Sequence, residues 1–129
     1  MPDTPIQVLL VDDDADLRDL LRNFFQQRGI EFSVLHDATH LARRLERERP
    51  SIIVLDLMMP DVTGYEVLEI LRDDEQTREV PIVVLTAVTM QRERDRCMSK
   101  GADAVMIKPF DPRDVAQAVG ALLSPAQSA

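Results

Sequence analysis

Four aspartates stand where they could bind a cation or carry a chemical group. Asp12, Asp13 and Asp14 directly follow an apolar run, and Asp56 ends another one. A buried carboxylate needs a partner, because even a neutral polar group without one costs about 2–7 kcal/mol. Neighbouring carboxylates also repel each other unless a cation lies among them. The aspartates therefore predict a site for a positive group, although one of the three consecutive residues could simply cap a helix.

Thr86 and Lys108 could complete such a site, because each of them also follows an apolar run. Oxygen ligands without His or Cys nearby favour a hard ion, and Mg²⁺ is the usual companion of phosphate groups. A metal ion, the Lys108 ammonium and the Thr86 hydroxyl around one aspartate would receive a doubly charged group such as a phosphoryl group. Asp56 would then be the nucleophile that forms an aspartyl phosphate.

Short apolar runs predict the strands that position these residues. Continuous runs, typical of strands buried on both faces, cover residues 6–11, 51–55 and 80–85. Shorter or mixed runs at residues 30–35 and 104–107 indicate outer strands. Because each run precedes a helical segment, we expect an α/β fold, a single doubly wound domain with a parallel sheet and helices on both faces. Its functional crevice lies beyond the carboxyl ends of the strands.

Apolar residues recur at helical spacing between the strands, with caps at several ends. The apolar positions are Leu17, Leu20, Leu21, Phe24 and Phe25; Ala38, Leu41, Ala42 and Leu45; Gly64, Val67, Leu68 and Leu71; and Val115, Ala118, Val119, Leu122 and Leu123. The capping signals are Asp37, Thr63 with Glu66, and Asp111 before Pro112, with Gly29 ending the first helix. A fourth helix, at about 89–100, has few apolar positions, so we expect it to be the most mobile helix.

Length and composition fit one globular domain, which we place at residues 6–124, with a flexible N-terminus at 1–5 and a tail or linker at 125–129. The 129 residues are 45% hydrophobic and 29% charged. A formal charge of −8 disfavours binding to nucleic acid or an anionic membrane, since both need a basic face. No signal or membrane segment is present, and the single cysteine, Cys97, fits a reducing compartment, so we expect a cytoplasmic protein.

Five blocks of sequence together resemble the response-regulator receiver domains of the CheY-like superfamily, which serve two-component phosphorelay systems. The blocks are Val11-Asp12-Asp13, Val54-Leu55-Asp56, Met59-Pro60 with Gly64 four residues later, Leu85-Thr86-Ala87 and Lys108-Pro109-Phe110. The resemblance implies a flavodoxin-like sheet with strand order 2-1-3-4-5, in which the ends of the first and third strands are neighbours.

The same resemblance implies a role for each site residue. Asp56 corresponds to the phosphoacceptor, and Mg²⁺, or Mn²⁺ in its place, would be bound by Asp13 and Asp56 directly, by Asp12 through water and by the carbonyl of Met58. Thr86 corresponds to the switch hydroxyl. The remaining phosphoryl-binding positions are Ala87 and Lys108, with a cis peptide bond between Lys108 and Pro109.

The resemblance also implies partners for a signalling domain rather than a turnover enzyme. The phosphoryl donor would be a sensor histidine kinase or a histidine phosphotransfer protein. The output would be a downstream protein or a domain absent from this chain, with no direct nucleic-acid or membrane binding. We expect a monomer or a weak dimer that depends on phosphorylation.

Three positions bear on how the signal is read and lost. Val105 stands where receivers usually carry an aromatic residue that rotates with the switch threonine, and a β-branched side chain cannot make that swing. Met58 and Val88 flank the site entrance in the family, and neither can position a water molecule. The hypothesis that follows is slow self-dephosphorylation.

Several alternatives compete with this interpretation. A haloacid-dehalogenase-like phosphatase also uses a strand-end Asp with Mg²⁺, but it needs a second Asp where this chain has Met58. A nucleotide- or flavin-binding domain would need a glycine-rich loop after the first strand. A pseudo-receiver that only binds proteins is the third alternative, and a metal site at His36 and His40 lacks a third ligand nearby. The arginine-rich stretches at 43–49 and 92–96 are interpreted as solvated helix faces, and a partner-docking role stays open for the second.

Overall fold

The fold is given by a computed structural model of the chain. It describes residues 7–12, 14–35, 40–47, 49–57, 64–75, 77–87, 91–107 and 111–123. Several predicted features therefore lie outside the described residues. These are the Asp37 and Thr63 caps, Ala38, and both predicted terminal segments.

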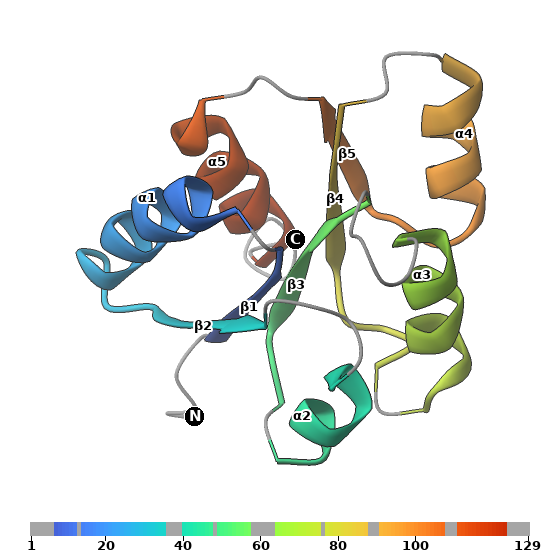
Figure 1. Cartoon of the computed structure of the whole chain (residues 1–129), viewed down its shortest axis with the longest axis horizontal. Coiled ribbons are helices and arrows are strands. Elements are labelled where there is room, and N and C mark those ends of the chain that lie inside the picture. Colours follow the sequence, from blue (N-terminus) through green and yellow to red (C-terminus); the bar gives the residue numbers. More distant parts are fainter. Residues whose placement is uncertain are drawn as a thin grey trace.

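Five parallel strands form one sheet in the order β2-β1-β3-β4-β5, which confirms the predicted doubly wound α/β fold (Figure 1). The strands are β1 (Gln7–Val11), β2 (Glu31–Leu35), β3 (Ile52–Asp56), β4 (Ile82–Thr86) and β5 (Ala104–Ile107). The helices are α1 (Ala15–Gln26), α2 (Leu41–Arg47), α3 (Gly64–Asp73), α4 (Gln91–Ser99) and α5 (Pro112–Leu123).

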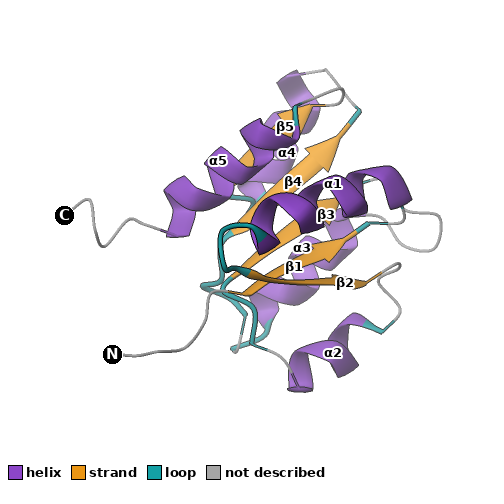
Figure 2. Cartoon of the chain, turned by 90° about the vertical axis from the view of Figure 1, so that its left-hand side faces the viewer, coloured by secondary structure: helices purple, strands orange, loops and turns teal. Residues whose placement is uncertain are grey.

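The sheet separates two hydrophobic cores. Helices α1 and α5 cover one face, and α3 and α4 cover the other, so that in Figure 2 the first pair lies in front of the sheet and the second behind it. Every residue of β3 and β4 is buried, whereas the edge strands β2 and β5 are mostly half-buried. The sequence predicted this difference, because central strands of a parallel sheet read as continuous apolar runs.

Two predicted helix faces need correction, although all four apolar positions of α3 are buried as predicted. In α1, Leu20 is 53% exposed, because it lies at the edge of the stripe that buries Leu17, Leu21 and Phe25. In α5, Ala116 is buried while Ala118 is only half-buried. The buried face of α5 is rotated relative to the predicted one, because this helix packs against α1 as well as against the sheet.

The caps of α1 and α5 act as predicted. The side chain of Asp14 accepts from the backbone N–H groups of Asp16 at 3.0 Å and Leu17 at 3.2 Å. Gly29 has φ +72°, a backbone conformation that glycine adopts without strain, and ends α1. At α5, Asp111 accepts from the backbone N–H of Arg113 at 2.8 Å.

Helix α4 is the one with the least apolar contact, as its sequence predicted. Cys97 is its only buried residue, and Met98 is 49% exposed. Its greater mobility stays a prediction.

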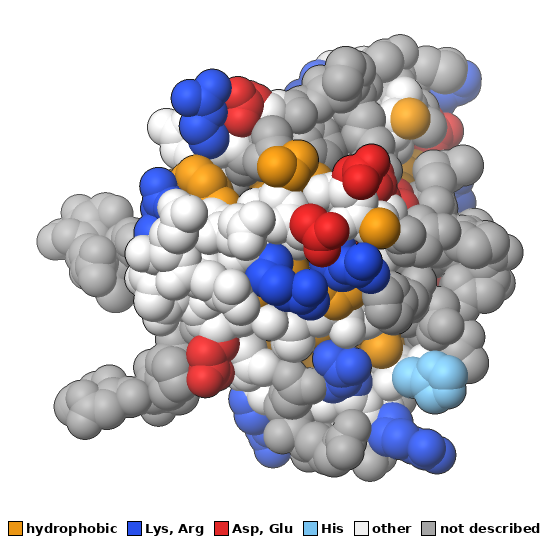
Figure 3. All heavy atoms as spheres, turned by 60° about the vertical axis from the view of Figure 1, so that its left-hand side comes forward, with side chains coloured by type: hydrophobic (Ala, Val, Ile, Leu, Met, Phe, Trp, Pro, Cys, Tyr) orange, Lys and Arg blue, Asp and Glu red, His pale blue; other side chains and the backbone are white. Residues whose placement is uncertain are grey.

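Side chains of both charges share the described surface. On the face seen in Figure 3, Lys and Arg side chains lie among Asp and Glu side chains. On α1, for example, Asp19 is within ion-pair distance of both Arg18 (3.5 Å) and Arg22 (3.9 Å). No helix in the described part of the chain is long and apolar enough to span a membrane.

Candidate functional site

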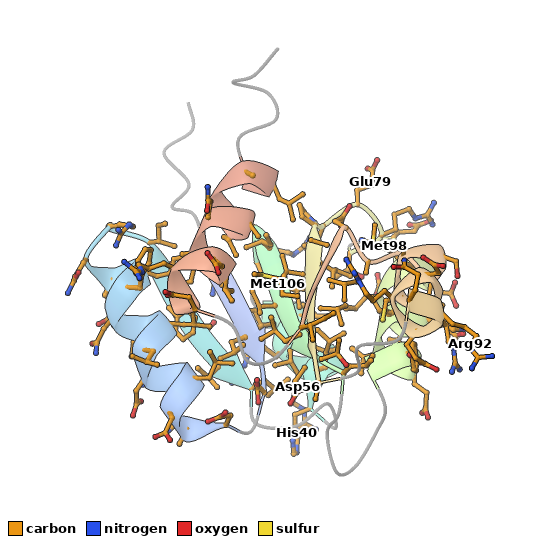
Figure 4. The ribbon with its side chains drawn as sticks, turned by 90° about the horizontal axis from the view of Figure 1, so that it is seen from above. His40, Asp56, Glu79, Arg92, Met98 and Met106 are labelled. Carbon is orange, nitrogen blue, oxygen red and sulfur yellow. The ribbon has the colours of Figure 1, made fainter. Side chains whose placement is uncertain are left out.

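The strand register brings two of the predicted aspartates together. Val11 of β1 is paired with Leu55 of β3, so Asp12 and Asp56 follow at the same level of neighbouring strands. Both carboxylates are buried, with exposed fractions of 1% and 3%. Figure 4 shows Asp56 at one end of the sheet, with the exposed His40 farther out at the same end. This is where the strand order reverses and where such folds bind ligands.

The consecutive aspartates have different structural positions. Asp12 is fixed at the strand end, since its backbone N–H donates to the carbonyl of Leu35 at 3.1 Å and its Oδ1 accepts from the backbone N–H of Asp14 at 2.9 Å. Asp14 is exposed and caps α1, which confirms that one aspartate of the run has a capping role. Asp13 lies outside the described residues.

Thr86 lies on the other side of Asp56. Asp56 is in register with Leu85 of β4, and the backbone N–H of Leu57 donates to the carbonyl of Leu85 at 2.9 Å. Thr86, the next residue, is buried with 2% of its surface exposed, whereas Ala87 is exposed. The apolar runs predicted strands that end at residues 55 and 85. Each strand extends one residue further, to Asp56 and Thr86, so both residues still lie at the carboxyl edge of the sheet.

Gly64 closes the site from the side of α3. A Cβ atom at this position would lie 2.6 Å from Cα of Leu57 and 3.2 Å from the carbonyl oxygen of Asp56. The backbone N–H of Gly64 also donates to the carbonyl of Leu57 at 2.9 Å. The sequence placed Gly64 on the buried face of a helix but gave no direct sign of this contact with the end of β3. Its place in the Met59-Pro60 block of the receiver resemblance was the only signal.

Several predicted site residues lie outside the part of the chain that the structure describes. They are Asp13, His36, Met58, Val88, Lys108 and Pro109. Ile107 of β5 is in register with Thr86, at the level of the site. Lys108, the predicted lysine, is the next residue in the sequence.

The donor atoms that are described fit a hard cation. Asp12 and Asp56 provide buried carboxylate oxygens side by side, which Mg²⁺ prefers as ligands. Two buried carboxylates at adjacent strand ends also need a positive partner to offset their repulsion. Among the described residues, no group of three or more His, Cys, Asp and Glu side chains could hold a metal ion.

Val105 faces the core layer of α3 and α4. It is half-buried and packs against the same hydrophobic cluster as Tyr65, whereas its neighbour Met106 packs on the opposite side with α1 and α5. Val105 therefore faces the side of the sheet that α3 and α4 cover, and it is not aromatic.

Comparison with known proteins decides the family. The description "Response regulator receiver domain" matches residues 8–120. This chain belongs to the response regulator receiver domain family. The response regulator Rre1 of Synechocystis sp. is 35% identical to this receiver domain over 125 residues, which cover 96% of the chain and 54% of that relative. The chain thus spans about half the length of Rre1.

Solved structures agree with the assignment. The chemotaxis response regulator CheY4 of Vibrio cholerae has a TM-score of 0.84 and 27% identity, with 92% of this chain and 99% of that chain covered. The receiver domain of sensor histidine kinase PA1611 from Pseudomonas aeruginosa has a TM-score of 0.81 and 26% identity, with 94% and 99% covered, and is described with a magnesium ion coordinated in its active site cleft. The chain is thus a phosphoryl-accepting signalling receiver of the two-component type, and the phosphatase, nucleotide-binding and pseudo-receiver alternatives are not favoured.

Proposed function

We propose that Asp56 is the residue that accepts the phosphoryl group. The observation that carries this proposal is the buried Asp56 carboxylate at the end of β3, beside the buried Asp12 of β1. A carboxylate oxygen of Asp56 attacks the phosphorus atom of the donor, and the donor leaves with the electrons of the broken bond. A bound cation would offset the repulsion between these two neighbouring carboxylates, which supports a site for a charged group here.

The residues proposed to hold Mg²⁺, or Mn²⁺ in its place, are Asp12, Asp13, Asp56 and the carbonyl of Met58. The bound cation supplies charge neutralisation for the phosphoryl oxygens and for the acidic side chains. Asp12 is already oriented for this task, because the backbone N–H of Asp14 holds its Oδ1.

Thr86, Ala87 and Lys108 are proposed to bind the phosphoryl group after transfer. Thr86 is buried next to the end of β3 and offers a hydroxyl donor, and the ammonium group of Lys108 would balance the added negative charge. Ala87, exposed beside Thr86, leaves space for the group.

The proposed partners follow from the family. The phosphoryl donor is a phosphohistidine on a sensor histidine kinase or on a histidine phosphotransfer protein. The receiver, proposed to occupy residues 6–124, acts as a signalling domain and not as a turnover enzyme, and it passes the signal to a separate protein or to a domain beyond this chain. Rre1, of which the chain covers 54%, leaves room for such a domain in a longer protein.

Phosphorylation can be tested with the isolated chain. After incubation with Mg²⁺ and a small phosphoryl donor, the intact mass is expected to rise by one phosphoryl group. Asp56→Asn should remove this rise, whereas the control Asp95→Asn, which changes an exposed aspartate of α4, should keep it. A wild-type protein without added mass, or an Asp56→Asn variant that still gains it, would contradict the proposal.

Slow loss of the phosphoryl group is a second expected result. The side chains of Met58 and Val88 cannot orient a water molecule for attack on the phosphorus atom, so the aspartyl phosphate should persist well beyond seconds. The decay of a radiolabelled phosphoryl group on the purified protein measures this, with the urea-denatured phosphoprotein as the reference for chemistry without the fold. Loss within seconds from the folded protein would refute it.

A further inference from the structure

Helix α4 has little apolar burial and makes polar contacts with α3. Cys97 is the only residue of α4 that is buried. Figure 1 shows α3 and α4 side by side on the same face of the sheet. Tyr65 of α3 contacts Glu93 and Arg96 of α4, and Glu69 of α3 contacts Lys100, the residue that directly follows α4. These polar side chains therefore contribute to the position of α4.

Tyr65 is the centre of the first contact. Its hydroxyl donates a hydrogen bond to the carboxylate of Glu93, and the guanidinium carbon of Arg96 lies 3.9 Å from the centre of its ring. Burial and the Glu93 carboxylate raise the pKa of Tyr65 well above its usual range, so the hydroxyl keeps its proton at neutral pH. Tyr65 thus binds two residues of α4 at once.

The same residue is directly connected to the phosphorylation site. Tyr65 follows Gly64, whose backbone N–H donates to the carbonyl of Leu57. Between Gly64 and the backbone of Asp56 and Leu57 there is no room even for a Cβ atom. A backbone shift at Asp56 or Leu57 must therefore move the first turn of α3, and Tyr65 moves with it.

The alternative route through β5 lacks its aromatic residue in this chain. Val105 faces the side of the sheet that α3 and α4 cover, and it packs against the same cluster as Tyr65. Tyr65 is the only tyrosine of the sequence. The one aromatic hydroxyl available to this core layer therefore comes from α3 and not from β5.

We propose that Tyr65 is a latch that couples phosphorylation to α4. In the unphosphorylated receiver its hydroxyl and ring hold α4 against α3. Phosphorylation of Asp56 shifts the first turn of α3, separates the Tyr65 hydroxyl from Glu93 and releases α4. The coupling rests on the proposed role of Asp56, whereas the latch in the unphosphorylated protein does not.

The latch can be tested without phosphorylation by hydrogen exchange. Tyr65→Phe keeps the ring but removes the donor, and it should speed exchange of the α4 amides about tenfold, because hydrogen bonds to charged groups limit local opening. Glu93→Gln keeps an oxygen acceptor but removes its charge, so it weakens the same bond from α4 and should speed exchange in the same direction by a smaller factor. Glu69→Gln, which weakens the contact between α3 and Lys100, is the matched control for the coupling experiment below. Unchanged α4 exchange in both Tyr65→Phe and Glu93→Gln would overturn the latch.

Tyrosine emission tests the coupling, because the chain contains one tyrosine and no tryptophan. With Mg²⁺ and a small phosphoryl donor, emission of Tyr65 should rise as its hydroxyl leaves the Glu93 carboxylate, and exchange of α4 should approach that of unphosphorylated Tyr65→Phe. Glu69→Gln should keep both changes, and Asp56→Asn should lose them. Intact mass is measured on the same samples. An added phosphoryl group with unchanged emission and α4 exchange overturns the coupling alone, whereas no added group overturns the proposed function and the coupling with it.

Discussion

Gly64→Ala is expected to destabilise the receiver by about 1–3 kcal/mol, the usual cost of overpacking a filled interior, and to slow phosphorylation of Asp56. The new Cβ would lie 2.6 Å from Cα of Leu57, and this neighbour is backbone that cannot rotate away. The first turn of α3 and the end of β3 must move apart. Because Asp56 ends β3, the same movement displaces its carboxylate, the proposed phosphoacceptor, from Asp12 and Thr86.

The matched control is the same substitution at Gly120 in α5. A Cβ at Gly120 meets nothing within 4 Å, and glycine inside a helix is less favourable than alanine by about 0.5–1 kcal/mol. Gly120→Ala should therefore raise the free energy of unfolding while Gly64→Ala lowers it. Equilibrium unfolding in urea measures both, and the rate of mass gain with a phosphoryl donor measures the effect on the site. Equal free energies of unfolding for the two variants would show that the contact between Gly64 and the end of β3 has room for a Cβ atom.

Much of the fold could be predicted because buried strands and buried helix faces have recognisable patterns of apolar residues in the sequence. The fully apolar runs became the central strands β3 and β4, and the mixed runs became the edges β2 and β5. Periodicity alone did not give the strand order, which came from the resemblance to receiver domains. The order matters most for function, because it makes Asp12 and Asp56 neighbours.

Contacts between exposed parts of different helices could not be predicted. The stretch at 92–96 was interpreted as a solvated face, because arginine and acidic residues alternate in it. That interpretation is wrong for Glu93, which is half-buried and accepts a hydrogen bond from Tyr65, whereas Arg96 is exposed as expected although it also lies against the Tyr65 ring. An alternating pattern of charges is the same whether the helix face contacts water or a side chain distant in sequence. Only the packing of α4 on α3 shows which of the two each residue contacts.

Arg72→Met is the substitution expected to cost the most stability outside the hydrophobic core, at about 2–4 kcal/mol. The guanidinium group of Arg72, at the end of α3, donates to the connection before β4 and to the connection before β5. Its acceptors are the carbonyls of Thr77 (3.3 Å), Arg78 (2.8 Å), Val80 (2.7 Å) and Gly101 (2.6 Å from Nη2 and 3.0 Å from Nε), and Oδ2 of Asp103 (2.9 Å).

The cost is large because one side chain joins the end of α3 to two connections at the amino-terminal edge of the sheet. Asp103, held by Arg72, also accepts from the backbone N–H of Ile82 at 2.8 Å and so aligns the start of β4. Lysine cannot replace arginine here. A single ammonium group cannot reach the acceptors before β4 and those before β5 at once, as the planar guanidinium group does. Arg72→Lys should therefore recover only a minor part of the loss.

A surface arginine provides the comparison that separates this network from charge alone. Arg113 has 78% of its side chain exposed and pairs with Asp111 at 2.8 Å, and exposed pairs contribute little. Arg113→Met should leave the urea midpoint nearly unchanged, while Arg72→Met lowers it strongly. Because Arg72 lies far along α3 from Gly64, phosphorylation of Asp56 should still occur in the fraction of Arg72→Met that remains folded. If both methionine variants unfold at the same urea concentration, the hydrogen bonds of Arg72 do not stabilise the edge of the sheet.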